Sequence, residues 1–542
     1  MTGTALRYFE TIRHLQPEQV LGRAWNKIAR PRPDARPAPG LRTQNGLWMT
    51  PAVRAATMTG PDSFRFLGQD GTVRCREDWN RPDAEKLWLY NLHYFDDLNA
   101  SEPETRTGWH EGLVARWIAE NPPGTGNGWE PYPLSLRLVN WIKWALGGVG
   151  LEDGWKDNLA VQARWLERHL EWHILGNHLF ANAKALIFAG HFFGSEEADR
   201  WLARGAAILS SELHEQTLAD GGHFELSPMY HSIILEDVLD LINLAHAYPG
   251  IPGARLEALL RDKAEAMLGW LDTMRHPDRQ ISFFNDAAFG IAAEPDQLGA
   301  YAERLGILAP CPPARLRLLE QSGYVRLEAP DCVALLDVAR IGPDYLPGHA
   351  HADSLSFELS LFGQRVIVNG GTSAYGLGEE RTRQRSTAAH STVEIAGENS
   401  SDVWAGFRVG RRAYPQDLEI TQGEDGTDVS CAHSGYRHLP GKPVHRRTWS
   451  LHGRKLTIND TVHGGEHPAV ARFHLAPDSG VVSTSEQEGR IYVAGRACAS
   501  WRTSNPARVA PSTWHPEFGK SVPSLSLELP LIDGAATLEL SW

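Results

Sequence analysis

The chain has 542 residues, with 53 Lys or Arg against 66 Asp or Glu, so its formal charge is −13. Hydrophobic residues make up 42% and charged residues 22%, which is typical of a folded protein and excludes a largely disordered or collagen-like chain. The acidic balance argues against sequence-independent nucleic-acid binding. It leaves a polyanionic substrate open, because a basic groove can lie on an acidic protein.

Cysteine content and the opening residues predict the compartment. The five cysteines are an odd number without a CxxC pair, which argues against a disulfide framework or a thiolate zinc site. Charged residues interrupt the opening MTGTALRYFETIRHLQPEQV where a signal peptide needs an apolar core. No apolar stretch of about 18 residues predicts a membrane span. We expect a cytoplasmic protein, with the periplasm as the alternative, and no nucleic-acid partner. The sequence does not predict the oligomeric state.

Residues 1–50 are expected to form a lead-in segment, and the residues that follow show helical periodicity. In 198–213, Trp201, Leu202, Ile208 and Leu209 fall on one face, and Ser195 is a plausible N-cap. Similar segments occur at 86–98, 110–120, 133–148, 157–171, 178–193, 232–248 and 255–274. Successive amphipathic helices with short links predict a helical bundle or an α/α toroid over residues 51–315.

The apolar period changes to two near residue 310, where Pro310, Pro312 and Pro313 mark a break. In 354–362, SLSFELSLF, apolar and polar residues alternate as in a strand. Further strands are expected at 332–340, 365–369, 391–396, 455–462, 470–475, 490–494, 524–529 and 535–541. This pattern predicts an antiparallel β-sandwich over residues 320–542.

Polar clusters mark candidate sites in both halves. GHAHAD places His349, His351 and Asp353 on one face of an extended chain, where they could bind a metal or move protons; a solvated loop is the alternative. Arg383 and Arg385 lie in RTRQR, and arginines suit bidentate binding of carboxylate or sulfate, unless this is a solvated charged loop. The helical half contributes GNHLFANAK, DGGHFELSPMYH, FFNDA and NGWEPYPLSLRLVNW. Each histidine taken alone more often packs or caps a helix.

Together these motifs resemble those of bacterial heparinase II/III-like polysaccharide lyases. The resemblance covers nearly the whole chain and is most specific in GNHLFANAKAL, DGGHFELSPMYH, FFNDA, GHAHADSLSFEL and AAHSTVEI. The opening RYFETIRHLQPEQVLGRAW is also similar to members encoded near exopolysaccharide genes, which often lack a clear signal peptide. The resemblance implies a toroid followed by a β-sandwich that begins near Gly323.

The resemblance also implies β-elimination at a uronic acid: a base removes the C5 proton, and the bond to the C4 oxygen breaks. Asn177 and His178 match the positions that neutralise the substrate carboxylate, where negative charge develops. Tyr230 matches the catalytic tyrosine, which protonates the leaving oxygen or acts as both base and acid. His349 matches the catalytic histidine and would be the base on the opposite face. Tyrosine needs a lowered pKa to act as a base, which a nearby arginine or histidinium could provide.

Other residues are assigned to binding. The candidate substrate-binding residues are Trp129, Tyr132, Arg137, Asn182, His223, Glu225, Arg383 and Arg385. Some family members hold a zinc ion whose ligands map to His351, Asn369 and His390. Asn369 replaces the usual aspartate, so affinity should fall, and the histidines could instead hydrogen-bond Asn369. No cofactor is expected for the chemistry; a structural zinc or calcium ion is left open.

Three functions are therefore weighed. The first is a lyase that cleaves an acidic, uronate-containing polysaccharide, with a bacterial exopolysaccharide preferred to heparin because residues 379–412 are only slightly basic. The second is a glycoside hydrolase on a similar scaffold, which needs two carboxylates, for which Glu225 and Asp286 are the candidates. The third is a non-catalytic glycan-binding or assembly protein.

Overall fold

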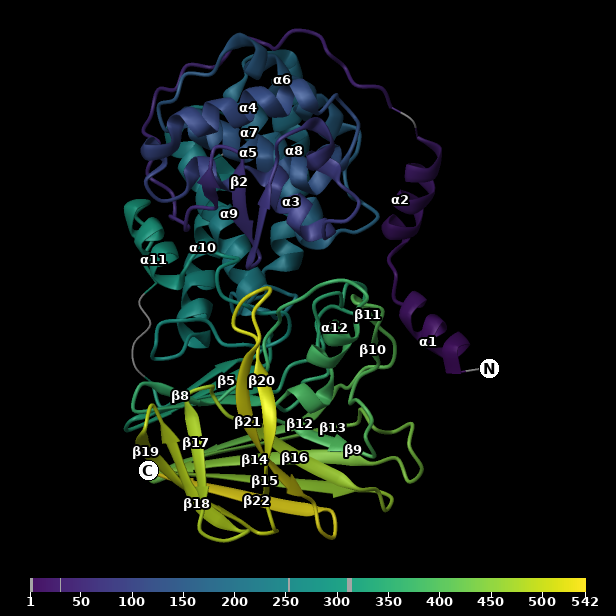
Figure 1. Ribbon diagram of the computed structural model, residues 1–542, viewed down its shortest axis with the longest axis vertical. Helices are drawn as coiled ribbons and strands as arrows, with labels where there is room; N and C mark the ends of the chain where they lie inside the picture. Colours follow the sequence, from purple (N-terminus) through teal and green to yellow (C-terminus); the bar gives the residue numbers. More distant parts are fainter. Residues whose placement is uncertain (1–2, 30, 252–253, 310–313) are drawn as a thin grey trace.

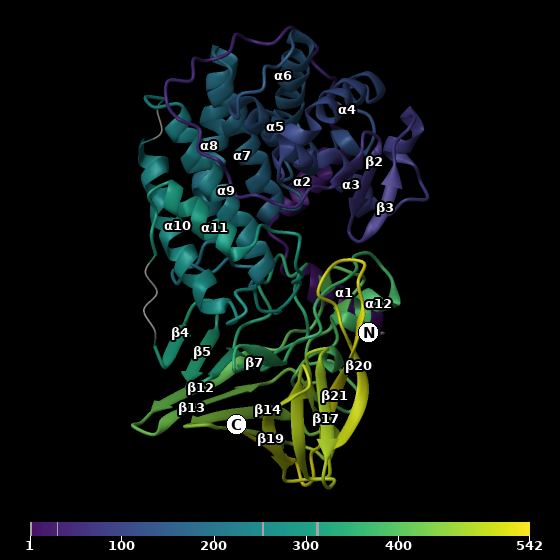
Figure 2. The same ribbon diagram turned by 60° about the vertical axis from the view of Figure 1, so that its left-hand side comes forward.

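The computed structural model describes residues 3–29, 31–251, 254–309 and 314–542. Helices dominate the first part of the chain and strands the second, and Figures 1 and 2 show the helical part lying against one side of the sheets. The α-helices are α1 (Gly3–Ile12), α2 (Pro17–Ile28), α3 (Lys86–Tyr94), α4 (Thr107–Glu120), α5 (Pro131–Leu146), α6 (Asp153–Glu167), α7 (Gly176–Phe192), α8 (Glu196–Gln216), α9 (Pro228–Ala247), α10 (Ala254–Met274), α11 (Pro295–Arg304) and α12 (Glu379–Gln384).

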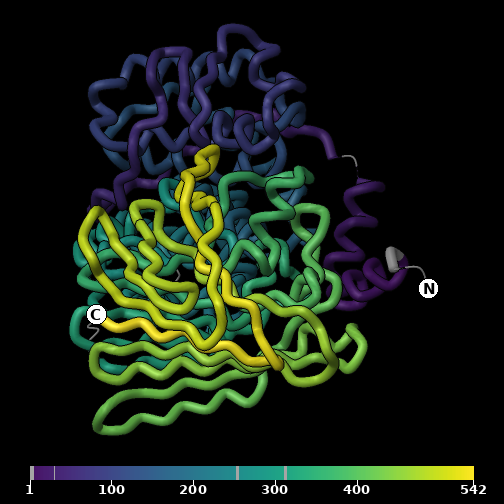
Figure 3. The backbone as a smooth tube through the Cα atoms, turned by 60° about the horizontal axis from the view of Figure 1, so that its bottom comes forward, coloured from purple at the N-terminus to yellow at the C-terminus, as the bar shows by residue number. Residues whose placement is uncertain are grey.

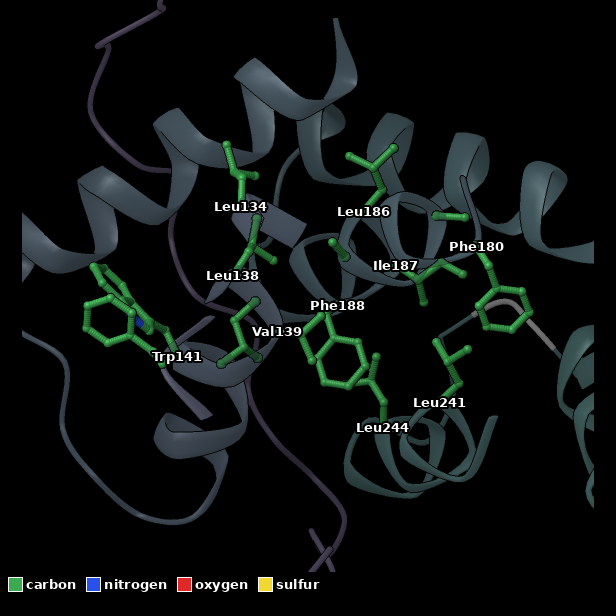
Figure 4. Packing of buried hydrophobic residues seen from close by; sticks show 14 of the residues in the cluster. Leu134, Leu138, Val139, Trp141, Phe180, Leu186, Ile187, Phe188, Leu241 and Leu244 are labelled. Carbon is green, nitrogen blue, oxygen red and sulfur yellow. The ribbon is translucent and has the colours of Figure 1, made fainter. Parts of the chain in front are cut away.

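The helical core explains why these segments are helices. In α8, Trp201 and Leu209 are buried on one face, and Ser195 caps the helix by accepting a hydrogen bond from the Ala198 amide at 3.2 Å. Helix α7 is buried on nearly all sides, because α5, α8 and α9 surround it. Figure 4 shows side chains from the three helices α5, α7 and α9 in contact, including Leu138, Phe188 and Leu244. The core of the helical part therefore lies between helices and is rich in aromatic residues.

The strands form antiparallel sheets. They are β1 (Met58–Gly60), β2 (Ser63–Phe66), β3 (Gln69–Thr72), β4 (Leu316–Leu319), β5 (Tyr324–Ala329), β6 (Cys332–Asp337), β7 (Phe357–Leu361), β8 (Gln364–Ile367), β9 (Val393–Ile395), β10 (Val403–Trp404), β11 (Arg408–Val409), β12 (Pro415–Gln422), β13 (Gly426–His433), β14 (Val444–His452), β15 (Lys455–His463), β16 (Ala469–His474), β17 (Ser479–Ser483), β18 (Glu488–Val493), β19 (Arg496–Thr503), β20 (Arg508–Trp514), β21 (Val522–Pro530) and β22 (Ala535–Ser541). The largest sheet has the order β12-β13-β14-β15-β22-β19-β18-β17 (Figure 3).

Strand β7 joins the two parts of the molecule. Its apolar residues face the sheet core, as their alternation predicts, but the polar residues between them are buried as well. Glu358 and Ser360 are buried because His276, just after α10, hydrogen-bonds both side chains at 2.9 and 2.8 Å. The polar face of this strand is therefore an internal contact with the helical part.

The prediction of helices first and antiparallel strands second is confirmed. The change falls between α11 and β4, while Pro310, Cys311, Pro312 and Pro313 lie outside the described residues. The proposed domain boundaries, the toroidal closure and the sandwich packing stay predictions. The four described cysteines are free thiols. A search of the described helices finds none long and apolar enough to cross a membrane.

Candidate active site

Tyr230 lies at the first turn of α9, where the helix meets the sheet part. Ser227 caps this helix: its hydroxyl accepts a hydrogen bond from the Tyr230 amide at 3.2 Å and donates one to the Asp286 carbonyl at 2.5 Å. The Tyr230 hydroxyl is 2.9 Å from the Tyr375 hydroxyl, and its ring stacks on His349 with 3.9 Å between centroids. Residues from three distant segments thus converge on one phenol.

Asp286 anchors the histidines of the GHAHAD motif. His349 Nδ1 and His351 Nε2 lie 2.9 and 2.8 Å from its two carboxylate oxygens, and Arg381 Nη2 donates to it at 2.7 Å. Burial raises the pKa of Asp286, but the Arg381 guanidinium and the two histidine donors outweigh it and hold the pKa well below its usual range. Because the carboxylate is ionised, it accepts the proton on His349 Nδ1, which leaves Nε2 as the basic nitrogen of this ring.

Glu225 is buried beside the same histidine. Its Oε2 lies 3.6 Å from His349 Nε2, and neither carboxyl oxygen has a hydrogen-bond partner among the described residues. Burial raises the pKa of Glu225, although His349 and His178 act in the opposite direction. A protonated carboxyl at this position is a neutral hydrogen-bond donor directed at a bound ligand.

Asn177 and His178 lie at the start of α7, and His178 is close enough to Glu225 for the two to interact electrostatically. The Asn177 amide has no hydrogen-bond partner within the described part of the chain, so it is available to a ligand. His178 Nδ1 lies 2.9 Å from Glu171 Oε1, and its ring packs on Tyr132 with centroids 4.3 Å apart. Burial lowers the pKa of His178, but the Glu171 carboxylate outweighs it, so the net shift is upward.

Left-handed backbone marks the loops that carry these residues. Leu175, Leu226 and Asn285 have φ values of 70°, 58° and 57°, and each lies within a few residues of a site side chain. Such a conformation costs a non-glycine residue about 1–3 kcal/mol and persists only where the surrounding structure imposes it. Residues of this kind occur at turns along the whole chain, and the loops before α7, before α9 and before Asp286 each contain one.

A cleft of about 1060 Å³ has Tyr375, the hydrogen-bond partner of Tyr230, in its wall. Tyr375 and Phe407 line it next to His349, while its other walls come from the β2–β3 hairpin, the start of α3, α12 and the β20–β21 loop. Figure 2 shows the hairpin and α3 facing the β20–β21 loop and α12 across the two parts. The size and position of the cleft fit a polymer chain that passes between the helical and sheet parts.

Several predicted binding residues lie elsewhere. Trp129 and Arg137 are buried in the helical core, where Arg137 donates to three acceptors and lies over the Trp117 ring, so neither can contact a substrate in the cleft. His223 is also fully buried, with Nε2 3.1 Å from Gln216 Oε1. These three residues do not line the cleft, and their assignment to substrate binding stays a prediction.

Other predicted binding residues support the site without facing it. Asn182 is buried and holds Glu171 through its backbone amide and its carboxylate, so it acts beneath His178. Arg385 is buried and donates two hydrogen bonds to the Ala350 carbonyl, which fixes the GHAHAD loop. Arg383 does line the cleft, where it pairs with Glu380 at 2.7 Å.

The three predicted metal ligands are hydrogen-bonded rather than open. His351 Nδ1 lies 3.2 Å from His390 Nε2, and its other nitrogen is on Asp286. Asn369 accepts from the Ser391 amide and donates to Ser356. In the ranges that the structure describes, no group of three or more His, Cys, Asp or Glu residues is arranged to hold an ion. That group of residue types does not include Asn369, and His390 Nδ1 is buried without a hydrogen-bond partner among the described residues, so the structural ion stays a prediction and no catalytic step is assigned to it.

Three residues of the site were not assigned a role from the sequence. Arg381 lies in the RTRQR segment, and Tyr375 follows the Gly370-Gly371 pair, which was an available signal for a turn. Glu171 carried no such signal, because it precedes His178 by seven residues in a loop and becomes its partner only through the fold. The structure shows that these residues set the surroundings of Tyr230, Asp286 and His178.

Comparisons with known proteins identify the family and the fold. A family model described as "Heparinase II/III-like, C-terminal" matches residues 312–541, and one described as "Heparinase II/III N-terminus" matches residues 155–297. Heparin-sulfate lyases from Bacteroides stercoris and Pedobacter heparinus are 28% and 27% identical over 41% and 44% of this chain. The matches span only 36% and 38% of those relatives. A crystal structure of heparinase III shares the fold, with a TM-score of 0.66 at 20% identity over 88% of this chain and 78% of that one.

Proposed function

The chain belongs to the heparinase II/III-like family, and from this premise we propose that it is a polysaccharide lyase that cleaves a uronate-containing polymer by β-elimination. The observation that carries the proposal is the convergence of Tyr230, His349 and Glu225, which Tyr375 connects to the wall of the cleft. A base, an acid and neutral donors for a carboxylate are the groups that elimination next to a uronate requires.

The substrate carboxylate is proposed to bind at the start of α7. Asn177 and the cation of His178 donate hydrogen bonds to it, and protonated Glu225 donates a third. Removing the C5 proton places additional negative charge on this group. Donors already oriented toward it stabilise the intermediate more than the ground state, and removing one donor of this kind costs about 10²–10³-fold in rate.

His349 is the proposed base and Tyr230 the proposed acid. Nε2 of His349 takes the C5 proton, the C4–C5 double bond forms as the bond to the C4 oxygen breaks, and that oxygen takes the proton of the Tyr230 hydroxyl. Burial is the largest of the effects that raise the pKa of Tyr230 well above its usual value, and the nearby Tyr375 and Asp286 raise it further. The phenol therefore retains its proton in the resting site, which suits an acid.

The hydrolase alternative is less consistent with the structure. A glycoside hydrolase needs two carboxyl groups free to act on the scissile bond. Asp286 is fully buried, ionised and bound to His349, His351 and Arg381, so of the candidate pair only Glu225 faces the site. Elimination needs one base and one acid, and His349 and Tyr230 lie together in the site for these roles.

The charge of the cleft bears on the substrate. Its cations Lys86, Arg383 and Lys520 are each paired with a carboxylate, at 3.0, 2.7 and 2.8 Å. A heavily sulfated chain needs unpaired cations along its path. We therefore propose a uronate polymer of low charge density, such as a bacterial acidic exopolysaccharide, rather than heparin.

Substitution of Tyr230 tests the proposal. Tyr230→Phe removes only the hydroxyl, so the formation of unsaturated uronate should fall by about 10²–10⁴-fold, the range expected for loss of a general acid. Tyr436→Phe is the matched control, because Tyr436 is also buried and donates one hydrogen bond, to the Val393 carbonyl at 2.9 Å, in the sheet part. Full activity of Tyr230→Phe with an unchanged melting temperature would reject Tyr230 as the acid.

A further inference from the structure

Helices α1 and α2 lie along one flank of the molecule, outside the helical core and beside the sheets (Figures 1 and 3). On α1, the side facing the protein carries Arg7, which pairs with Asp402 at 2.9 Å, and Thr11, which donates to the Val409 carbonyl at 3.3 Å. The opposite side carries Leu6, Phe9 and Ile12 at helical spacing, and all three are exposed. The polar face of α1 is turned inward and its apolar face outward.

Helix α2 has the same inverted orientation. Its inner face presents Gln19, which is buried and donates to the Ile174 and Tyr345 carbonyls, and Gly22, where a methyl group would be 2.7 Å from the His173 amide. The apolar stripe on its outer face has exposed fractions of 69% at Leu21, 64% at Trp25 and 75% at Ile28. A surface helix ordinarily buries this stripe in the core, so a continuous exposed stripe marks an interaction surface.

The charge of this segment is opposite to that of the chain. Residues 1–32 contain six Arg or Lys and two Asp or Glu, whereas the whole chain has a formal charge of −13. Arg23 and Lys27 are exposed on α2 and have no ionic or hydrogen-bonded partner among the residues described. Helix α2 carries Arg23 and Lys27 against Glu18 and exposes Leu21, Trp25 and Ile28, which is the composition of helices that lie in the headgroup region of a lipid bilayer.

We propose that the outer faces of α1 and α2 bind the surface of an anionic membrane. The apolar stripes would enter the boundary between headgroups and acyl chains, while Arg23 and Lys27 contact anionic headgroups. The helices have 10 and 12 residues, so they lie on the bilayer rather than cross it. A second copy of the chain fits less well, because a symmetric contact would bring two basic segments together.

Vesicle flotation of the full chain tests the proposal. With phosphatidylcholine vesicles that contain phosphatidylglycerol, we expect the protein to float with the lipid. Binding should weaken as salt is raised and be lost with phosphatidylcholine alone. Leu21→Ser with Trp25→Ser should reduce bound protein by about tenfold or more, and Arg23→Gln with Lys27→Gln should remove the preference for anionic lipid.

The matched control replaces equally exposed apolar residues in the sheet part. Val482→Ser with Ile532→Ser removes side chains that are 54% and 51% exposed, and this variant should float like the wild-type protein. All variants should retain the wild-type circular dichroism melt, because these side chains lie outside the core. Failure to float with anionic vesicles overturns the proposal. A dimer that Leu21→Ser with Trp25→Ser converts to a monomer, without vesicle binding, would assign the surface to a second copy instead.

Discussion

At the residue scale, Asp286 determines the protonation of its neighbours. Its ionised carboxylate fixes the proton of His349 on Nδ1, and it raises the pKa of Tyr230 together with burial and Tyr375. The expectation that an arginine or histidinium would lower the tyrosine pKa is wrong for the resting site, because Arg381 is already bound to Asp286. This arrangement assigns the base and the acid to different residues.

Glu225 can be tested by comparing two substitutions of similar size. Glu225→Gln keeps a neutral donor, so kcat/KM should stay within about threefold of wild type, whereas Glu225→Leu should lose about 10²-fold because a donor to the substrate carboxylate is gone. Steady-state kinetics on the same polymer measure both. Equal loss in the two variants would mean that the site requires the negative charge of Glu225.

The pH dependence follows from His178. Its pKa is raised, so the imidazolium proposed to bind the substrate carboxylate persists above the usual value of 6.5, and kcat/KM should fall as the pH rises through the raised pKa. Glu171→Gln removes the main raising partner, so the fall should move to lower pH. The other groups that face His178 are Glu225, Glu130, His173 and Tyr132.

The control for this experiment is Glu111→Gln, on the exposed face of α4, which should leave the pH profile unchanged. If Glu171→Gln and wild type show the same alkaline limb, His178 does not act as a cation.

The site could be predicted from sequence where residues lie inside compact motifs, as Tyr230, Glu225 and His349 do. Glu171 could not, because its role depends on how a loop folds over the start of α7.

At the scale of elements, the start of α7 positions Asn177 and His178, the residues proposed to bind the carboxylate. Gly176 has a φ of 58°, and a methyl group there would collide with Leu346 and come within 3.5 Å of Glu225 Oε1. We expect Gly176→Ala to lower the free energy of unfolding by about 1–3 kcal/mol and to reduce activity by displacing Asn177. Thermal or urea unfolding, with a parallel activity assay, measures both effects.

Gly154 provides the comparison, because it lies within α6 with open space around it. Gly154→Ala should leave activity unchanged and stabilise the protein by up to about 1 kcal/mol, since alanine favours a helix interior. Equal behaviour of the two alanine variants would contradict the role given to the Gly176 backbone.

Sequence patterns predicted some helices and strands and missed others, and the difference has a physical reason in each case. Helix α8 was predicted because one apolar face packs on the core and a serine caps it. Helices α1 and α2 were missed within the expected lead-in, and their apolar faces are exposed rather than packed on the core. Strand β20 was also missed, because it is an edge strand that contains Pro511 and has no fully buried residue.

At the scale of the whole molecule, the cleft exists because the helical and sheet parts are joined. His276 is one of the buried links: burial and Arg365 lower its pKa, so it is neutral, donates to Glu358 and accepts from Ser360. His276→Leu leaves the buried Glu358 carboxylate short of a donor, so the free energy of unfolding should fall by about 1–3 kcal/mol. His214→Leu, on the exposed surface of α8, should change it by less than about 0.5 kcal/mol. Equal stability of the two variants in urea unfolding would reject His276 as a link.

We propose that the protein catalyses elimination on a polymer bound in the cleft. Ultraviolet absorbance of the C4–C5 double bond in the products measures this reaction directly. Purified protein is mixed with a panel of uronate polymers of low charge density, with heparin for comparison and His349→Ala alongside the wild type. We expect the absorbance to rise on at least one polymer of low charge density, to rise more than on heparin, and to stay flat with His349→Ala. New reducing ends without any rise in absorbance would contradict it, because they would show hydrolysis in place of elimination.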